Sequence, residues 1–164
     1  MASLTIKEGD LLDQEVEVIV NAWNRNFIPW WLLLPQGVSG AIKRRAGFDP
    51  FWELGRKGIL PLGAAVLTGA GRLSFRGIIH VAGIGILWRS SEKSIRMSVR
   101  NVLALATQQG FRSIAFPLIG AGTGGGRAEK VEATMVDEIH RSDFPCEVVL
   151  VRYRRGADLK EKTR

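Results

Sequence analysis

Cysteine and histidine are scarce in this chain of 164 residues, and their scarcity argues against several kinds of site. A single cysteine, Cys146, cannot form an internal disulfide or a zinc site made of cysteines alone. The two histidines, His80 and His140, are too few for a histidine-rich metal site. We therefore expect no metal and no redox cofactor. We interpret Cys146 as a small buried apolar residue and His80 as a structural histidine within a strand.

Long hydrophobic runs are also missing. The stretch 30–34 holds only five apolar residues, whereas a membrane-spanning helix needs roughly 20. The N-terminus shows no basic region followed by an apolar stretch, so no secretory signal is visible. These absences predict a cytoplasmic protein. The composition, 46% hydrophobic and 24% charged, is typical of one ordinary globular domain.

The net charge of +7 favours anionic partners. Part of this charge lies near the C-terminus, in Arg152, Arg154, Arg155, Lys160, Lys162 and Arg164. We interpret this cluster as part of a solvated tail, and divide the chain into a domain over 1–155 and a basic tail over 156–164. No recognised nucleic-acid-binding module accompanies the cluster, so binding of nucleic acid by the tail is a minor alternative.

The pattern of apolar residues predicts strands that alternate with helices. The expected strands cover 4–8, 17–22, 64–68, 77–81, 113–118 and 147–153, and the expected helices cover 41–46, 50–57, 91–109 and 128–141. The helix at 91–109 is the clearest, because Ser90 or Ser91 can cap it and Gly110 can end it. Such alternation predicts a three-layer α/β fold, in which ligands bind beyond the carboxyl ends of the strands.

The most distinctive stretch is a loop with five glycines between residues 120 and 126. It follows an expected strand and opens an expected helix. Glycine lets a ligand approach the main chain closely, and a helix N-terminus offers unpaired N–H groups to a phosphate. The loop matches neither of the common nucleotide-binding glycine motifs. It therefore predicts a diphosphate site, with the nucleotide left open, while a plain flexible turn is the alternative.

Six blocks of this chain, taken in order, resemble the macrodomain family, whose members bind ADP-ribose and in some cases hydrolyse its derivatives. The blocks lie at 9–11, 18–24, 37–42 with 45–47, 61–68, 78–83, and 113–117 with 119–122. Each block is weak alone, but their order and spacing make the match specific. The resemblance covers nearly the whole chain. It implies a three-layer α/β/α sandwich with a mixed, mostly parallel central sheet.

The resemblance also implies roles for individual residues. Asp10 would accept a hydrogen bond from the adenine amino group, and Tyr153 would stack on the adenine ring. Asn24 would contact the distal ribose and is the one candidate catalytic residue. The remaining ligand-binding candidates are Leu11, Ala22, Gly37, Val38, Ser39, Gly40, Ile119, Gly120, Ala121, Gly122, Thr123, Gly124 and Gly125. A turn role for Asp10 and Asn24 and a half-buried strand-end role for Tyr153 are the alternatives.

This chain departs from the family pattern at three places. Hydrolytic macrodomains commonly carry an acidic residue where this chain has Ser39, and serine cannot act as a base toward water at neutral pH. They carry a run of glycines where this chain has residues 34–36, and an aromatic residue where it has Gly124. The loop before Gly37 is longer than usual and contains Trp30 and Trp31, which either cover the ligand, contact a partner or pack onto the domain.

We therefore predict an ADP-ribose-binding macrodomain that hydrolyses an ADP-ribosyl derivative, namely ADP-ribosylated protein or nucleic acid, or O-acetyl-ADP-ribose. A small stand-alone domain favours an enzyme, whereas Ser39 favours the alternative of a non-catalytic ADP-ribose reader. A second alternative is a nucleic-acid-binding domain that uses the basic tail. The expected partners are ADP-ribose and ADP-ribosylated macromolecules, with no membrane among them.

Overall fold

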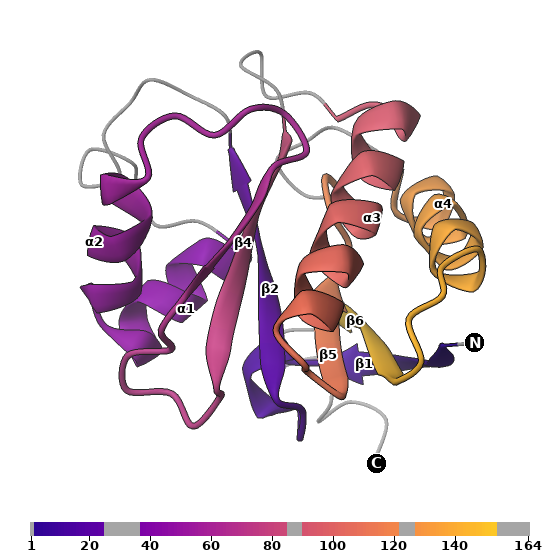
Figure 1. The fold of residues 1–164 in the computed structure, drawn as a ribbon. Coiled ribbons are helices and arrows are strands. Elements are labelled where there is room, and N and C mark those ends of the chain that lie inside the picture. Colours follow the sequence, from indigo (N-terminus) through magenta and orange to yellow (C-terminus); the bar gives the residue numbers. More distant parts are fainter. Residues whose placement is uncertain (1, 25–36, 85–89, 122–126, 154–164) are drawn as a thin grey trace, which may run out of the picture.

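The computed structural model describes residues 2–24, 37–84, 90–121 and 127–153 (Figure 1). In chain order its elements are β1 (Ser3–Gly9), the 3-10 helix η1 (Leu11–Asp13), β2 (Val18–Asn24), α1 (Gly37–Ala46), α2 (Asp49–Arg56), β3 (Ala65–Thr68), β4 (Gly77–Ile84), α3 (Glu92–Gln108), β5 (Ser113–Pro117), α4 (Ala128–His140) and β6 (Glu147–Tyr153). Every expected strand and helix is present, with small shifts at the ends. The largest shift is in α1, which begins at Gly37 rather than at residue 41. The sequence did not predict η1.

The strands form one six-stranded sheet in the order β1-β6-β5-β2-β4-β3. Each neighbouring pair from β1 to β4 is parallel, and only β3 runs antiparallel to its neighbour. The expected mixed, mostly parallel sheet is therefore confirmed. Because parallel strands end at the same edge of a sheet, the residues that end β1, β6, β5, β2 and β4 line one edge. They are Gly9, Tyr153, Pro117, Asn24 and Ile84.

Helices cover both faces of the sheet, with α1 and α2 on one side and α3 and α4 on the other (Figure 1). Alternate residues of a strand point to opposite faces, and the core divides accordingly. In β6, Val148 and Leu150 pack with the residues of α3 and α4. Val149 and Val151, their neighbours in sequence, pack with those of α1 and α2. This division confirms the three-layer arrangement.

The ends of α3 follow the signals in the sequence. Ser91 is the N-cap: its Oγ accepts a hydrogen bond from Ser94 N at 3.1 Å, and Ser94 Oγ accepts one from Ser91 N at 2.9 Å. This reciprocal pair satisfies two backbone donors that the helix itself leaves unpaired. Gly110 has a φ of +72°, a conformation that glycine adopts without strain and that ends the helix. The predicted cap and stop are both confirmed.

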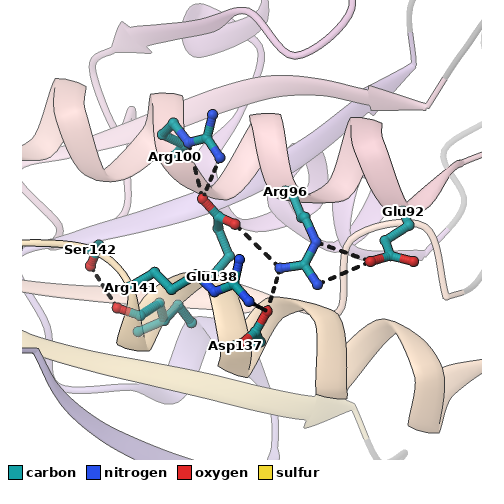
Figure 2. Close-up of polar contacts among 8 residues, drawn as sticks. Glu92, Arg96, Arg100, Asp137, Glu138, Arg141 and Ser142 are labelled. Carbon is teal, nitrogen blue, oxygen red and sulfur yellow. Dashed lines mark hydrogen bonds and ion pairs between the residues drawn. The ribbon is translucent and has the colours of Figure 1, made fainter.

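A network of charged side chains joins α3 to α4 (Figure 2). Arg96 contacts Glu92 at 3.0 Å, Asp137 at 2.6 Å and Glu138 at 3.3 Å, and Arg100 contacts Glu138 at 2.8 Å. The Glu138 side chain is only 6% exposed and pairs with both arginines. The network therefore links the two helices on their face of the sheet.

Two expectations about the C-terminal part need correction. The sequence places Arg152 in the solvated basic cluster, but Arg152 lies in β6 and pairs with Glu132 of α4, with both N–O distances 2.6 Å. Residues 154–164 lie outside the described residues.

Cys146 is half-buried, rather than buried, and packs against the core on the α3 and α4 side. None of the described helices is long and apolar enough to cross a bilayer.

Candidate ligand-binding site

Asp10 stands at the edge of the sheet, directly after β1. Its Oδ1 accepts a hydrogen bond from Leu12 N at 2.9 Å, so Asp10 caps η1. Leu11 and Leu12 are 3% and 5% exposed and anchor η1 in the core. The second carboxylate oxygen of Asp10 lies 3.9 Å from Arg45 Nη1 at the end of α1. One oxygen of the Asp10 carboxylate is thus bound within the turn, which agrees with the alternative turn role for Asp10. Because the Leu11 side chain is buried, Leu11 can offer a ligand only its main chain.

Tyr153, the last residue of β6, lies next to this turn. β1 and β6 pair in parallel, and Tyr153 is the register partner of Gly9. Tyr153 is 59% exposed, which leaves ring surface available for stacking. The two residues assigned to adenine therefore come together from the two ends of the described chain.

The predicted first phosphate loop forms the first turn of α1. Gly37, Val38, Ser39 and Gly40 all lie in that turn, which carries no acidic residue. The first N–H groups of a helix have no acceptor within the helix and carry a partial positive charge. Val38 and Ser39 are half-buried and Gly40 is buried. This turn can therefore bind an anion through its main chain.

The second predicted phosphate loop begins after β5. Ile119 is fully buried, and its N–H donates to Met135 Sδ at 3.4 Å, so that group is not available to a ligand. Gly120 has a φ of +83°, and a Cβ added to it would lie 2.4 Å from Ser90 Oγ, so only glycine fits here. Ala121 is half-buried and packs against the core. The other members of this loop, Gly122, Thr123, Gly124 and Gly125, lie outside the described residues.

Asn24 ends β2 at the same edge. The pairing of β2 with β4 shifts between Trp23 and Asn24, because Gly83 is an extra residue on β4. Such bulges redirect the strand that follows them. Ala22 is half-buried and packs on the α3 and α4 side of the sheet. The side chain of Asn24 and both Trp30 and Trp31 lie outside the described part of the chain.

A row of hydrogen-bonded, buried polar side chains leads from α1 across the sheet, and no sequence pattern reveals that it reaches the site. Asn21 Nδ2 lies 3.0 Å from His80 Nδ1 and 3.4 Å from Ser39 Oγ, and His80 Nε2 lies 2.8 Å from Thr68 Oγ1. Asn21 and His80 are fully buried, and burial lowers the pKa of His80 to about 3. His80 is thus a neutral structural histidine, as predicted. The signal that could have revealed its partner is Asn21, a polar residue between apolar neighbours in a central strand.

Lys43 is a second residue whose setting the sequence did not reveal. It follows Ser39 by one helical turn on α1 and is only 8% exposed. Its Nζ lies 5.5 Å from the ring centroid of Trp23 and 4.9 Å from that of Phe51. Burial lowers the pKa of Lys43, while the two aromatic faces favour its charged form. A lysine spaced four residues from Ser39 was the available signal, since such residues share a helix face.

Taken together, these residues lie along one edge of the sheet of an α/β domain. One end of the edge has an aromatic ring and a carboxylate, and the middle has a helix N-terminus and a glycine turn. No group of three histidine, cysteine or acidic side chains suited to a metal ion occurs among the described residues. The arrangement is suited to a nucleotide that carries a diphosphate.

Comparisons with known proteins show the family to which this chain belongs. The model of the Macro domain family matches residues 20–135. A protein of Salmonella typhimurium named O-acetyl-ADP-ribose deacetylase is 37% identical over 162 residues, which cover 92% of this chain and 87% of that protein. An uncharacterized protein of Aquifex aeolicus is 34% identical over 151 residues, 90% of this chain and 88% of its own. A solved Oceanobacillus iheyensis macrodomain variant with ADPR has a TM-score of 0.76 at 27% identity, covering 97% of this chain and 89% of its own. This chain belongs to the Macro domain family.

Proposed function

We propose that this chain binds ADP-ribose along the carboxyl edge of its sheet. The observation that carries the proposal is the order of the strands at that edge. Starting from β1 and β6, which bring Asp10 and Tyr153, the edge passes the Gly120 turn after β5 and reaches Asn24 at the end of β2. This is the order of adenine, diphosphate and distal ribose in an extended ADP-ribose. Three strand spacings separate β1 from β2, about 14 Å in all, which is on the scale of that ligand.

The known relatives support this ligand. The Oceanobacillus iheyensis macrodomain has been solved with ADP as well as with ADPR. In this chain the diphosphate would lie between the first turn of α1 and the turn at Gly120, held by main-chain N–H groups. Asp10 would accept a hydrogen bond from the adenine amino group through the carboxylate oxygen that does not cap η1. Tyr153 would stack on the adenine ring.

We further propose that the chain hydrolyses an ADP-ribosyl derivative, with O-acetyl-ADP-ribose as the first candidate because relatives at 37% identity bear the name of that deacetylase. In this reaction the oxygen of water adds to the acetyl carbonyl carbon and the bond to the ribose oxygen breaks. The ribose oxygen takes one proton of the water, the other passes to solvent, and acetate and ADP-ribose leave. Asn24, at the end of the edge where the distal ribose would lie, is the residue we assign to holding the ribose or the water.

A reader of ADP-ribose is the second candidate, and Ser39 is the observation that favours it. The first turn of α1 carries no acidic residue that could accept a proton from water. A domain with this turn can bind ADP-ribose tightly without turning over any derivative. ADP-ribosylated proteins or nucleic acids would then be its partners.

The experiment is a calorimetric titration with ADP-ribose, followed by release assays on O-acetyl-ADP-ribose, ADP-ribosylated protein and ADP-ribosylated DNA. Binding with turnover of one substrate, lost in Asn24→Ala, supports the hydrolase. Binding without turnover supports the reader. Absence of ADP-ribose binding contradicts both. Binding to nucleic acid that weakens steeply with salt and survives Asp10→Ala would instead support the basic tail as the binding element.

A further inference from the structure

The buried hydrogen bonds that connect Thr68, His80, Asn21 and Ser39 run in one definite direction from donor to acceptor. Thr68 Oγ1 lies 3.0 Å from the carbonyl oxygen of Gly69, and a hydroxyl can only donate to a carbonyl. With its proton so used, Thr68 Oγ1 accepts from His80 Nε2 at 2.8 Å. Nε2 therefore carries the proton of the neutral ring, and His80 Nδ1 is an acceptor. It accepts from Asn21 Nδ2 at 3.0 Å.

The orientation of the Asn21 amide agrees with this direction. Nδ2 faces both His80 Nδ1 and Ser39 Oγ, so both of its protons have acceptors. Oδ1 of Asn21 is buried and has no hydrogen-bond partner in the described part of the chain. Reversing the amide would instead leave the two N–H protons buried without acceptors. An underused carbonyl oxygen is the better tolerated of the two, so the observed orientation is favoured.

Ser39 is the outer end of the chain. Its Oγ accepts from Asn21 Nδ2 at 3.4 Å, and among the described residues no acceptor faces its own proton. Ser39 is half-buried in the first turn of α1, where the helix end attracts an anion. A hydroxyl whose inner side is already occupied by a donor can only donate outward. Within the described part of the chain its proton is therefore available to a ligand at this turn.

On this basis, and resting on the proposed function, we infer that the Ser39 hydroxyl donates a hydrogen bond to an oxygen of the ligand's diphosphate, and that Asn21, His80 and Thr68 are positioning residues that fix its direction. Ser39 is then a specificity-determining binding residue. It adds a side-chain donor to the main-chain donors of the turn.

The first test measures Kd for ADP-ribose, ADP and adenosine by calorimetry or competition. Ser39→Ala is expected to weaken the binding of ADP-ribose and of ADP about tenfold, which corresponds to one hydrogen bond to a charged group. The affinity for adenosine should not change. Ser39→Thr retains the hydroxyl and keeps the affinity within about twofold. If the wild type binds ADP-ribose and Ser39→Ala binds it equally well, the inference is wrong. If the wild type does not bind, the proposed function itself has failed.

The second test examines the direction of the chain without disrupting the core. In ¹⁵N NMR spectra of the wild type, the His80 ring should show a protonated Nε2 and an unprotonated Nδ1, and His140→Gln assigns the signals because the chain has only two histidines. A protonated Nδ1 would reverse the direction of these hydrogen bonds, so that the Ser39 hydroxyl would donate inward to Asn21. This result would overturn the inference.

The third test uses Thr68→Val, which matches the shape of threonine and lies on the edge strand β3, away from Ser39. It removes the hydroxyl that accepts the hydrogen bond from His80 Nε2. The affinity for ADP-ribose should therefore fall roughly threefold, within the range of couplings between hydrogen-bonded residues. In the Ser39→Ala background the same change should have no further effect. Additive losses in the two variants would show that Thr68 acts on the fold alone and would contradict its positioning role.

Discussion

Tyr153 and Gly9 are register partners in adjacent parallel strands, so an exposed aromatic residue at the end of the described chain lies beside the residue that precedes Asp10. This pairing depends on β6 lying between β1 and β5. It brings together a ring and a carboxylate that no local sequence pattern connects. The adenine end of the proposed site is therefore a product of the sheet topology.

The role of Tyr153 can be separated from that of its hydroxyl. Tyr153→Ala should weaken ADP-ribose binding roughly tenfold, since stacking of a base on an aromatic side chain contributes about 1–3 kcal/mol. Tyr153→Phe keeps the ring and should bind nearly as well as the wild type. Because Tyr153 is 59% exposed, neither change should lower the melting temperature much. Calorimetry and thermal denaturation check both points, and equal loss in the two variants would contradict stacking.

Asp10 has a capping role that must be separated from ligand binding. Asp10→Asn keeps an oxygen that can accept from Leu12 N, so η1 should remain folded. It removes the charge and replaces the second oxygen by a donor, so adenine binding should fall roughly tenfold. Asp13→Ala is the matched control, because Asp13 also pairs with Arg45, at 3.0 Å. Full ADP-ribose affinity in Asp10→Asn, measured by calorimetry, would assign Asp10 to the turn alone.

Gly120 and Gly110 form a natural pair of glycines for testing the second phosphate loop. Both have positive φ, +83° and +72°, so alanine should cost each roughly 1–2 kcal/mol of folding free energy through backbone strain. Only at Gly120 would the new Cβ clash with Ser90, whereas the space around Gly110 is open. Gly120→Ala should therefore lose ADP-ribose affinity and Gly110→Ala should keep it. Urea denaturation and calorimetry separate the two effects, and intact binding in Gly120→Ala would remove this turn from the site.

His80 should make the domain labile to acid. Its pKa is about 3 when folded, against about 6.5 for an unfolded histidine, because burial disfavours its charged form. Between these two values the unfolded state binds a proton that the folded state excludes, so stability falls as the pH falls. The expected slope is about 1.4 kcal/mol per pH unit from this residue. Above pH 6.5 its contribution is constant.

Urea denaturation at a series of pH values between 4 and 8 measures this slope. His80→Gln cannot titrate, so it should be less stable than the wild type near neutral pH but show a flatter decline in acid. His140→Gln removes the exposed histidine and should keep the wild-type slope. If His140→Gln, rather than His80→Gln, flattens the curve, the buried chain is not the source of the acid sensitivity.

The charged network between α3 and α4 should respond asymmetrically to substitution. Arg96→Met removes one of the two arginines that pair with the buried carboxylate of Glu138 and leaves Arg100 as its remaining contact in the network. Because the carboxylate is buried, water does not replace the lost ion pair. Glu138→Gln leaves two arginines that water can still reach. Arg96→Met should therefore lower the midpoint of denaturation more than Glu138→Gln. The reverse order would mean that the network contributes through packing rather than charge.

Local patterns in the sequence predicted most of the fold. Alternating or continuous apolar stretches located every expected strand, and Ser91 and Gly110 set the ends of α3. The start of α1 was placed too late because residues 37–40 contain two glycines, which lower helix propensity. Tertiary packing, and not propensity, decides that turn. The pairing of Arg152 with Glu132 was likewise invisible, because it depends on where β6 meets α4.

The candidate site was predicted less completely, for a physical reason. Asp10 and Tyr153 could be named from the family pattern, but their adjacency follows from the strand order alone. The contact between Ser39 and Asn21 joins residues on different elements and cannot be read from spacing. Sequence patterns report which face of an element is apolar. They do not report which polar residues meet inside the core.

The position of β6 also has a consequence for synthesis on the ribosome. β1 has β6 as its neighbour in the sheet, so β1 must wait for a segment that emerges after all the other described strands. Closing so long a loop is entropically slow, and an unpaired strand edge is prone to wrong pairing. The nascent chain would acquire the adenine end of its site last. ADP-ribose added during translation would therefore select chains in which the final strand has already docked.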